Sequence, residues 1–194
     1  MLARAHDSSA RHRPVERAVR SAARGKRLVL AVSGGRDSMA LLHAAAHVAH
    51  GSVAMVATFD HGTGAAATRA AALVASEAAM LGFPVVVGSA ARKASTEAEW
   101  REMRLQFLEE IARSTGAVIA TAHTRDDQVE TVFMRVLRGS GPRGLAGLFA
   151  SGTSLRPLLV VSRDEVAAYA ATAGVRWVED PSNASSRHLR NRVR

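Results

Sequence analysis

The segment Ser33-Gly34-Gly35-Arg36-Asp37-Ser38 combines glycines, hydroxyl groups and a carboxylate in a pattern that suits phosphate binding. Two adjacent glycines let the backbone approach a ligand closely, and successive N–H groups with two serine hydroxyls can hold phosphate oxygens. Asp37 would place a negative charge beside that ligand, and a bridging Mg²⁺ would relieve the repulsion. The alternative is an ordinary turn with a helix cap. A Walker A loop is excluded, because the chain contains no Gly-Lys-Ser/Thr sequence.

The same segment permits a second function. Residues 31–35 approximate the G-x-S-x-G turn that carries the nucleophile of α/β-hydrolases, and Asp180 and His188 follow in the order of that fold. A serine hydrolase that uses Ser33 is therefore the runner-up. It is the weaker alternative because the first position is alanine, the turn follows the first expected strand, and 194 residues is short for that fold.

A second polar cluster follows a short apolar run near residue 120. His123, Asp127 and Glu130 are spaced i, i+4 and i+7, so within one helix they would share a face. Thr124 is a suitable N-cap, and Asp126 and Asp127 would then lie in the first turn, where the helix dipole favours acids. The functional alternative is a carboxylate pair that receives a cationic substrate such as an ammonium group, and a third is a metal site, although nothing completes its coordination shell.

The remaining motifs are basic. Gly139, Gly141 and Gly144 match G-x-G-x-x-G by letters, but the run follows a helix and so is not a dinucleotide-binding turn. With Arg138 and Arg143 it favours a loop that contacts a phosphate backbone. The tail at 187–194 alternates arginines with apolar residues, which fits either a solvated terminus or nucleic-acid contact.

Composition narrows the function classes further. The absence of cysteine excludes a disulfide scaffold, a thiolate zinc site and a cysteine nucleophile. Lys and Arg number 26 against 17 Asp and Glu, so the formal net charge is +9. That balance allows a polyanionic partner, although an arginine-rich chain can also reflect genome composition.

The elements that must position these residues form a βαβα series. Continuous apolar runs, typical of strands buried on both faces, occur at 28–32, 53–57, 85–87 and 117–120. Helical patterns occupy 37–50, 68–81, 95–115 and 162–173. Another helix is marked by one apolar face of Val129, Val132, Phe133, Val136 and Leu137, and a last short strand is expected at 175–178. This order predicts an α/β fold: a doubly wound parallel sheet of about five strands with helices on both faces.

The first 27 residues differ in composition from the rest. Arginines dominate them, and an amphipathic helix with Val15, Ala18, Val19 and Ala22 on one side is expected, with a transit peptide as the alternative. We therefore divide the chain into a basic helical extension at 1–27 and one catalytic domain at 28–194. No apolar run approaches the roughly 20 residues of a membrane span, so the cytoplasm is the expected location.

Taken in order, the motifs resemble those of the PP-loop ATP pyrophosphatases, and among them the catalytic domain of tRNA(Ile)-lysidine synthases. The resemblance runs from about residue 28 to the end of the chain. The absence of cysteine agrees with this branch, since related tRNA thiolation enzymes are expected to need it. The matching segments are 33–38, 60–62, 101–104, 123–131, 138–145, 156–159, 179–183 and 190–194.

This resemblance implies an ATP- and Mg²⁺-dependent ligase with two steps. The wobble cytidine of tRNA(Ile) with a CAU anticodon is first adenylated at its C2 oxygen, and free L-lysine then displaces AMP. The resemblance implies that ATP is bound by Ser33, Gly34, Gly35, Arg36, Asp37 and Ser38, and that Asp37 also binds Mg²⁺. It implies catalytic roles for Asp37, Arg101 and His123. Lysine would be bound by Asp127, Glu130 and Arg190, and the tRNA would be contacted by Arg138 and Arg143. A catalytically weakened ATP-binding fragment is the alternative within the family. The oligomeric state stays open, with a homodimer as one option.

Overall fold

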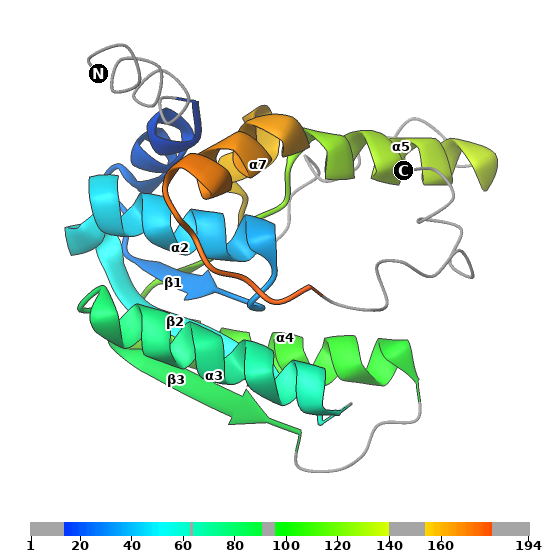
Figure 1. Cartoon of the computed structure of the whole chain (residues 1–194). Helices are drawn as coiled ribbons and strands as arrows, with labels where there is room; N and C mark the ends of the chain where they lie inside the picture. Colours follow the sequence, from blue (N-terminus) through cyan, green and yellow to red (C-terminus); the bar gives the residue numbers. More distant parts are fainter. Residues whose placement is uncertain (1–13, 63, 91–95, 140–153, 180–194) are drawn as a thin grey trace.

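A five-stranded sheet, all of whose strand pairs are parallel, forms the centre of the protein (Figure 1). The computed structural model describes residues 14–62, 64–90, 96–139 and 154–179. The strand order is β3-β2-β1-β4-β5. The strands are β1 (Leu28–Ala31), β2 (Val53–Asp60), β3 (Val85–Ser89), β4 (Val118–Ala120) and β5 (Ser154–Leu155). The expected doubly wound α/β fold is confirmed.

Successive residues of β1 are buried on opposite faces of this sheet. Leu28 and Leu30 belong to the larger core, together with residues of the helices α2, α3 and α7, whereas Val29 packs with Leu108 of helix α4 on the other face. Burial on both faces explains why the strands appear as continuous apolar runs. The helices are α2 (Arg36–Val48), α3 (Ala65–Met80), α4 (Glu97–Thr115), α5 (Arg125–Leu137) and α7 (Arg163–Thr172), with short 3₁₀ turns at η1 (His50–Ser52) and η3 (Pro157–Val160).

A further helix over residues 14–23 packs onto the same core. Val15 and Val19 are fully buried there, and Ala18 and Ala23 accompany them. The amphipathic pattern thus identified the buried side, with Ala23 more buried than the expected Ala22. The boundary that we place at residue 27 remains a prediction, although this helix shares its core with the rest of the domain.

Residues 175–178 do not form the expected fifth strand, which lies instead at Ser154–Leu155. The reason is that their backbone bonds elsewhere: Val175 N–H donates to Ala170 C=O, and Val178 N–H donates to Gly34 C=O, each at 2.9 Å. This segment crosses α2 after α7 and runs toward α3 (orange in Figure 1). Arg176 fixes it by pairing with the buried carboxylate of Glu77 in α3.

The predicted helix at α5 is confirmed, but its apolar face is not buried by the described part of the chain. Val129, Phe133, Val136 and Leu137 are all exposed. Figure 1 shows the far end of α5 projecting beyond the sheet. Across the described ranges, no helix is both long and apolar enough to cross a membrane.

Candidate functional site

The site lies where the strand order changes direction. From β1 the chain proceeds outward to β2 and β3, and then returns to place β4 on the other side of β1. The loops after β1 and β4 therefore start at the carboxyl ends of two neighbouring strands, which is the place where open α/β sheets bind ligands. The two polar clusters found in the sequence occupy these two loops.

The loop after β1 is held by its own serines. Ser38 Oγ donates to Gly35 C=O at 2.8 Å and accepts from Ser33 N–H at 3.1 Å. Ser33 Oγ lies 3.1 Å from Ser38 Oγ and 3.5 Å from Gly35 N. The N-cap of α2 is Gly35, so no side chain caps the first turn. The backbone N–H groups at this helix start therefore face the loop without a competing carboxylate or hydroxyl cap, as an anion site requires.

Gly34 is the position in this loop that tolerates substitution least. Its φ of +83° lies in the left-handed region, and a Cβ built on it would be 2.8 Å from Ala70 Cβ of α3. Its carbonyl also accepts from Val178. The loop is thus pressed between α3 and the segment after α7, and only glycine fits there.

Asp37 is the second residue of α2 and its side chain is 29% exposed. Its Oδ1 lies 3.1 Å from Arg36 Nε, so its charge is balanced on one side. Mg²⁺ is commonly held by one or two carboxylates together with substrate phosphates. Among the described residues no cluster of three or more metal-ligating side chains occurs. A metal held by Asp37 together with substrate phosphates fits this arrangement.

The loop after β4 corrects one expectation. Helix α5 begins at Arg125 with Thr124 as its N-cap, so His123 lies before the helix and does not share a face with Asp127 and Glu130 by helical spacing. His123 Nδ1 instead lies 2.9 Å from Thr121 Oγ1. Asp127 Oδ2 accepts from Thr124 N–H at 2.8 Å and from Thr124 Oγ1 at 3.0 Å, which completes a capping box. The expected N-cap, Thr124, is therefore confirmed, and Asp126 and Asp127 lie in the first turn as expected. The part of Asp127 in the capping box does not conflict with a further role.

Asp127 and Glu130 are both buried, with 7% and 5% exposure. One guanidinium nitrogen of Arg163, the first residue of α7, lies 2.7 Å from Glu130 Oε1 and 3.5 Å from Asp127 Oδ1. Burial disfavours the charged form of Arg163, but the hydrogen bond to Glu130 and the nearby carboxylates outweigh it and raise the Arg163 pKa. Buried charges require such partners. Sequence reasoning did not find this arginine, because a single arginine after a helix cap carries no functional pattern.

Three arginines and a histidine form a cationic cluster near the ends of β2 and β5. We define it as His61, Arg101, Arg104 and Arg156. Burial and then the charge of Arg101 lower the pKa values of both Arg104 and Arg156. Burial and then the charge of Arg104 lower the pKa of His61, while Asp60 opposes this. His61 Nδ1 is buried without a hydrogen-bond partner in the described residues, and Trp100 meets the ring edge-on at 5.5 Å between centroids.

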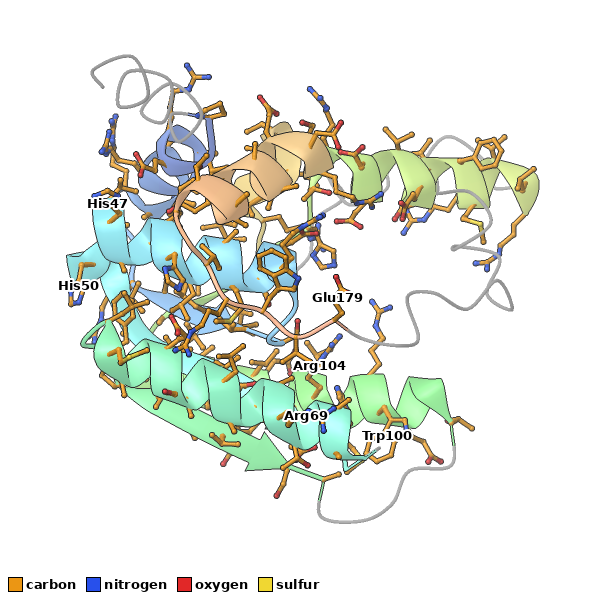
Figure 2. All side chains as sticks on the ribbon, in the orientation of Figure 1. His47, His50, Arg69, Trp100, Arg104 and Glu179 are labelled. Atoms are coloured by element: carbon orange, nitrogen blue, oxygen red, sulfur yellow. The ribbon has the colours of Figure 1, made fainter. Side chains whose placement is uncertain are left out.

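Like charges that depress one another's pKa values are destabilising unless an anion compensates them. The cationic cluster therefore suits a phosphate-bearing ligand. Figure 2 shows Arg104 on α4 and Arg69 on α3 in this region, with Glu179 at the end of the segment that crosses α2. Arg101 is one of the expected site residues. Arg104, Arg156 and His61 lie in matching sequence motifs, but the sequence alone assigns them no role.

We expect Arg104→Gln to raise the pKa of His61, because the substitution removes a repulsive charge. An NMR titration of the His61 ring measures this directly. Since the folded-state pKa lies below the ordinary value, His61 costs stability as the pH falls below about 6.5, and Arg104→Gln should lessen that loss. Arg113→Gln, an exposed arginine on the same helix, is the control. An unchanged His61 pKa in Arg104→Gln would contradict the cluster.

Two expected site residues, Arg143 and Arg190, lie outside the described residues, as do Asp180 and His188 of the hydrolase alternative. Arg138 is described and is the exposed C-cap of α5. Ser33 Oγ, the would-be nucleophile of a hydrolase, is hydrogen-bonded with Ser38.

Comparison with solved structures supports the fold. The U34-tRNA thiolase NcsA from Methanococcus maripaludis superposes with a TM-score of 0.77 at 15% identity, covering 95% of this chain and 71% of that one. The NH3-dependent NAD synthetase from Campylobacter jejuni gives 0.57 at 13% identity, covering 87% and 74%. At these identities the likeness concerns the fold alone.

Sequence comparison gives closer relatives. Proteins named tRNA(Ile)-lysidine synthase from Salinispora tropica and Methylobacterium nodulans are each 42% identical over 86% of this chain, covering 54% and 52% of their own length. That from Salinispora arenicola is 39% identical over the whole chain and 62% of its own length. The chain thus spans about half the length of the curated relatives it matches. A family model described as the PP-loop domain matches residues 8–194, and the chain belongs to that family.

Proposed function

We propose that this chain is a tRNA(Ile)-lysidine synthase, which uses ATP to join lysine to the wobble cytidine of tRNA(Ile) with a CAU anticodon. The observation that carries the proposal is the pairing of a glycine-rich anion loop with a buried carboxylate pair at neighbouring strand ends. The names of its relatives, at about 40% identity, point to the same reaction.

The first step forms a bond between the C2 oxygen of cytidine and the α-phosphorus of ATP, and pyrophosphate leaves. This chain's part is to bind and orient the phosphates through the backbone of residues 33–38 and to stabilise the charge that develops on them. The cationic cluster supplies further positive charge. Bound Mg²⁺, held by Asp37 and the phosphates, would neutralise negative charge on the triphosphate.

In the second step the ε-amine of lysine bonds to C2, and AMP leaves with the C2 oxygen. An amine attacks only after losing its proton, so the ε-ammonium group must first give a proton to a base or to water while the site holds the lysine. We assign recognition of the lysine ammonium to Asp127 and Glu130 and of its carboxylate to Arg190. His123 borders the reacting centre. The tRNA contacts of Arg138 and Arg143, and a cytoplasmic location, belong to the same proposal.

We expect Glu130→Gln to separate the two steps. The amide keeps the size of the side chain but loses its charge, so the KM for lysine should rise by about 10- to 100-fold, which is the scale of one lost charge-assisted hydrogen bond in a buried site. Pyrophosphate release that depends on tRNA should change less than about two-fold, because Glu130 does not lie in the phosphate loop. Parallel assays of pyrophosphate release and lysine uptake measure both quantities in one preparation. An equal loss of both would refute the assigned role.

A further inference from the structure

The amino termini of α5 and α7 meet at the carboxylate pair. Arg163 N–H donates to Asp126 Oδ2 at 2.7 Å, and Arg125 N–H donates to Val161 C=O at 2.9 Å. Each helix starts with its own capping box, Thr124 with Asp127 and Ser162 with Glu165. The backbone of Arg163 is therefore fixed by α7, while its guanidinium reaches across to α5.

The guanidinium of Arg163 shares one nitrogen between the two carboxylates. It lies 2.7 Å from Glu130 and 3.5 Å from Asp127, and the arginine side chain itself is 24% exposed. Two carboxylates buried this closely would repel each other without a cation between them. With Arg163 in place, its positive charge offsets part of the negative charge of Asp127, Glu130 and the nearby Asp126.

We propose that Arg163 is a positioning residue for amine recognition: it keeps Asp127 and Glu130 together as an ionised pair that accepts one primary ammonium group. This inference rests on the proposed function, because it explains how the lysine ammonium is bound there. The three carboxylates around Arg163 outnumber it, so the site keeps the negative charge that an ammonium group requires. The guanidinium, held by the start of α7, also fixes the side-chain orientation of Glu130, so the amine meets a preformed acceptor.

The test uses the whole chain with Arg163→Met and Arg163→Lys. Methionine keeps the unbranched length but removes the charge, so the KM for lysine should rise about 30-fold, on the scale of losing one partner of a buried charge pair. Lysine restores the charge without the planar fork and should bring KM back to within about five-fold of wild type. In both variants tRNA-dependent pyrophosphate release should stay within about two-fold.

Glu165→Gln is the matched control, because it weakens the capping box at the start of α7 without touching the carboxylate pair. Glu165→Gln should leave the KM for lysine unchanged. If Glu165→Gln instead raised this KM as much as Arg163→Met does, Arg163 would act only by anchoring α7, which overturns the proposal. Equal loss of pyrophosphate release and lysine uptake in Arg163→Met would overturn it as well.

Two outcomes separate this inference from the proposed function. If the wild-type protein releases pyrophosphate with tRNA but takes up no lysine, the proposed function itself fails, and with it the role of Arg163. If wild-type uptake is normal and Arg163→Lys behaves no better than Arg163→Met, only the role of Arg163 fails. Should Arg163→Met not fold, Arg163→Lys alone still decides. A rise in the KM for lysine of up to about five-fold at unchanged pyrophosphate release supports the proposal, whereas an unchanged KM, or an equal loss of pyrophosphate release and lysine uptake, overturns it.

Discussion

Gly34→Ala is expected to lower kcat/KM for ATP by about 100-fold, the scale of a roughly 1 Å misplacement of a group that orients a substrate. The new Cβ would lie 2.8 Å from Ala70 Cβ and 3.0 Å from Ala70 C=O, so either α3 or the loop must move. The φ of +83° adds about 1–2 kcal/mol for any residue with a Cβ. Because Val178 bonds to the Gly34 carbonyl, a shift in the loop also disturbs the segment that lies over it.

Gly25→Ala is the control that separates backbone strain at a positive φ from displacement of the loop by a new Cβ. Gly25 has a φ of +67°, but a Cβ there would meet nothing within 4 Å. This variant should lose about 1–2 kcal/mol of unfolding free energy and keep its kcat/KM. ATP-dependent pyrophosphate release and denaturant unfolding, measured for both variants, give the comparison. If Gly34→Ala retained full activity, the loop would not be the phosphate site.

Asp37→Asn is expected to reduce tRNA-dependent pyrophosphate release by at least about 100-fold, as is typical when one group that stabilises transition-state charge is removed. The substitution keeps the shape of the side chain and removes the one carboxylate in the 33–38 loop that could hold a cation against phosphates. Folding should be almost unaffected, because Asp37 is partly exposed and its ion pair with Arg36 is a surface contact.

The alternative interpretation of Asp37 is that it only complements the dipole of α2. Asp164 tests this, since it too is the second residue of a helix, follows an arginine and lies in the first turn. Asp164→Asn should cost a few tenths of a kcal/mol of stability and leave pyrophosphate release unchanged. If Asp37→Asn behaved like Asp164→Asn in both assays, the catalytic role of Asp37 would be wrong.

The sequence was most informative where a local pattern decides the structure. The apolar runs at β1, β2, β3 and β4 predicted parallel strands, and each strand contributes residues to the cores on both faces of the sheet. Covering is incomplete at β3 and β4, where Val87 and Val118 are exposed. The loop at 33–38 is recognisable from its sequence because adjacent glycines, two serines and an aspartate together suit phosphate binding. Thr124 was correctly expected as the N-cap of α5. These features depend on neighbours within a few residues.

The features that were missed depend on residues far apart in the chain. Residues 175–178 have the composition of a strand, yet Val178 bonds to Gly34 and Arg176 to Glu77, about 100 or more positions away. Arg163 reaches Glu130 across 33 positions, and no local pattern signals that contact. His123 was grouped with Asp127 and Glu130 by spacing, but the capping box places it before the helix.

The measurement that tests the central claim most directly is incorporation of labelled lysine into a tRNA(Ile) transcript with a CAU anticodon. It should be run with and without ATP, and with a transcript whose wobble cytidine is replaced by uridine. We expect incorporation that needs both ATP and the cytidine. Incorporation without ATP, or equal incorporation into the uridine transcript, would contradict the proposed function, as would pyrophosphate release with the cytidine transcript but no lysine in the product.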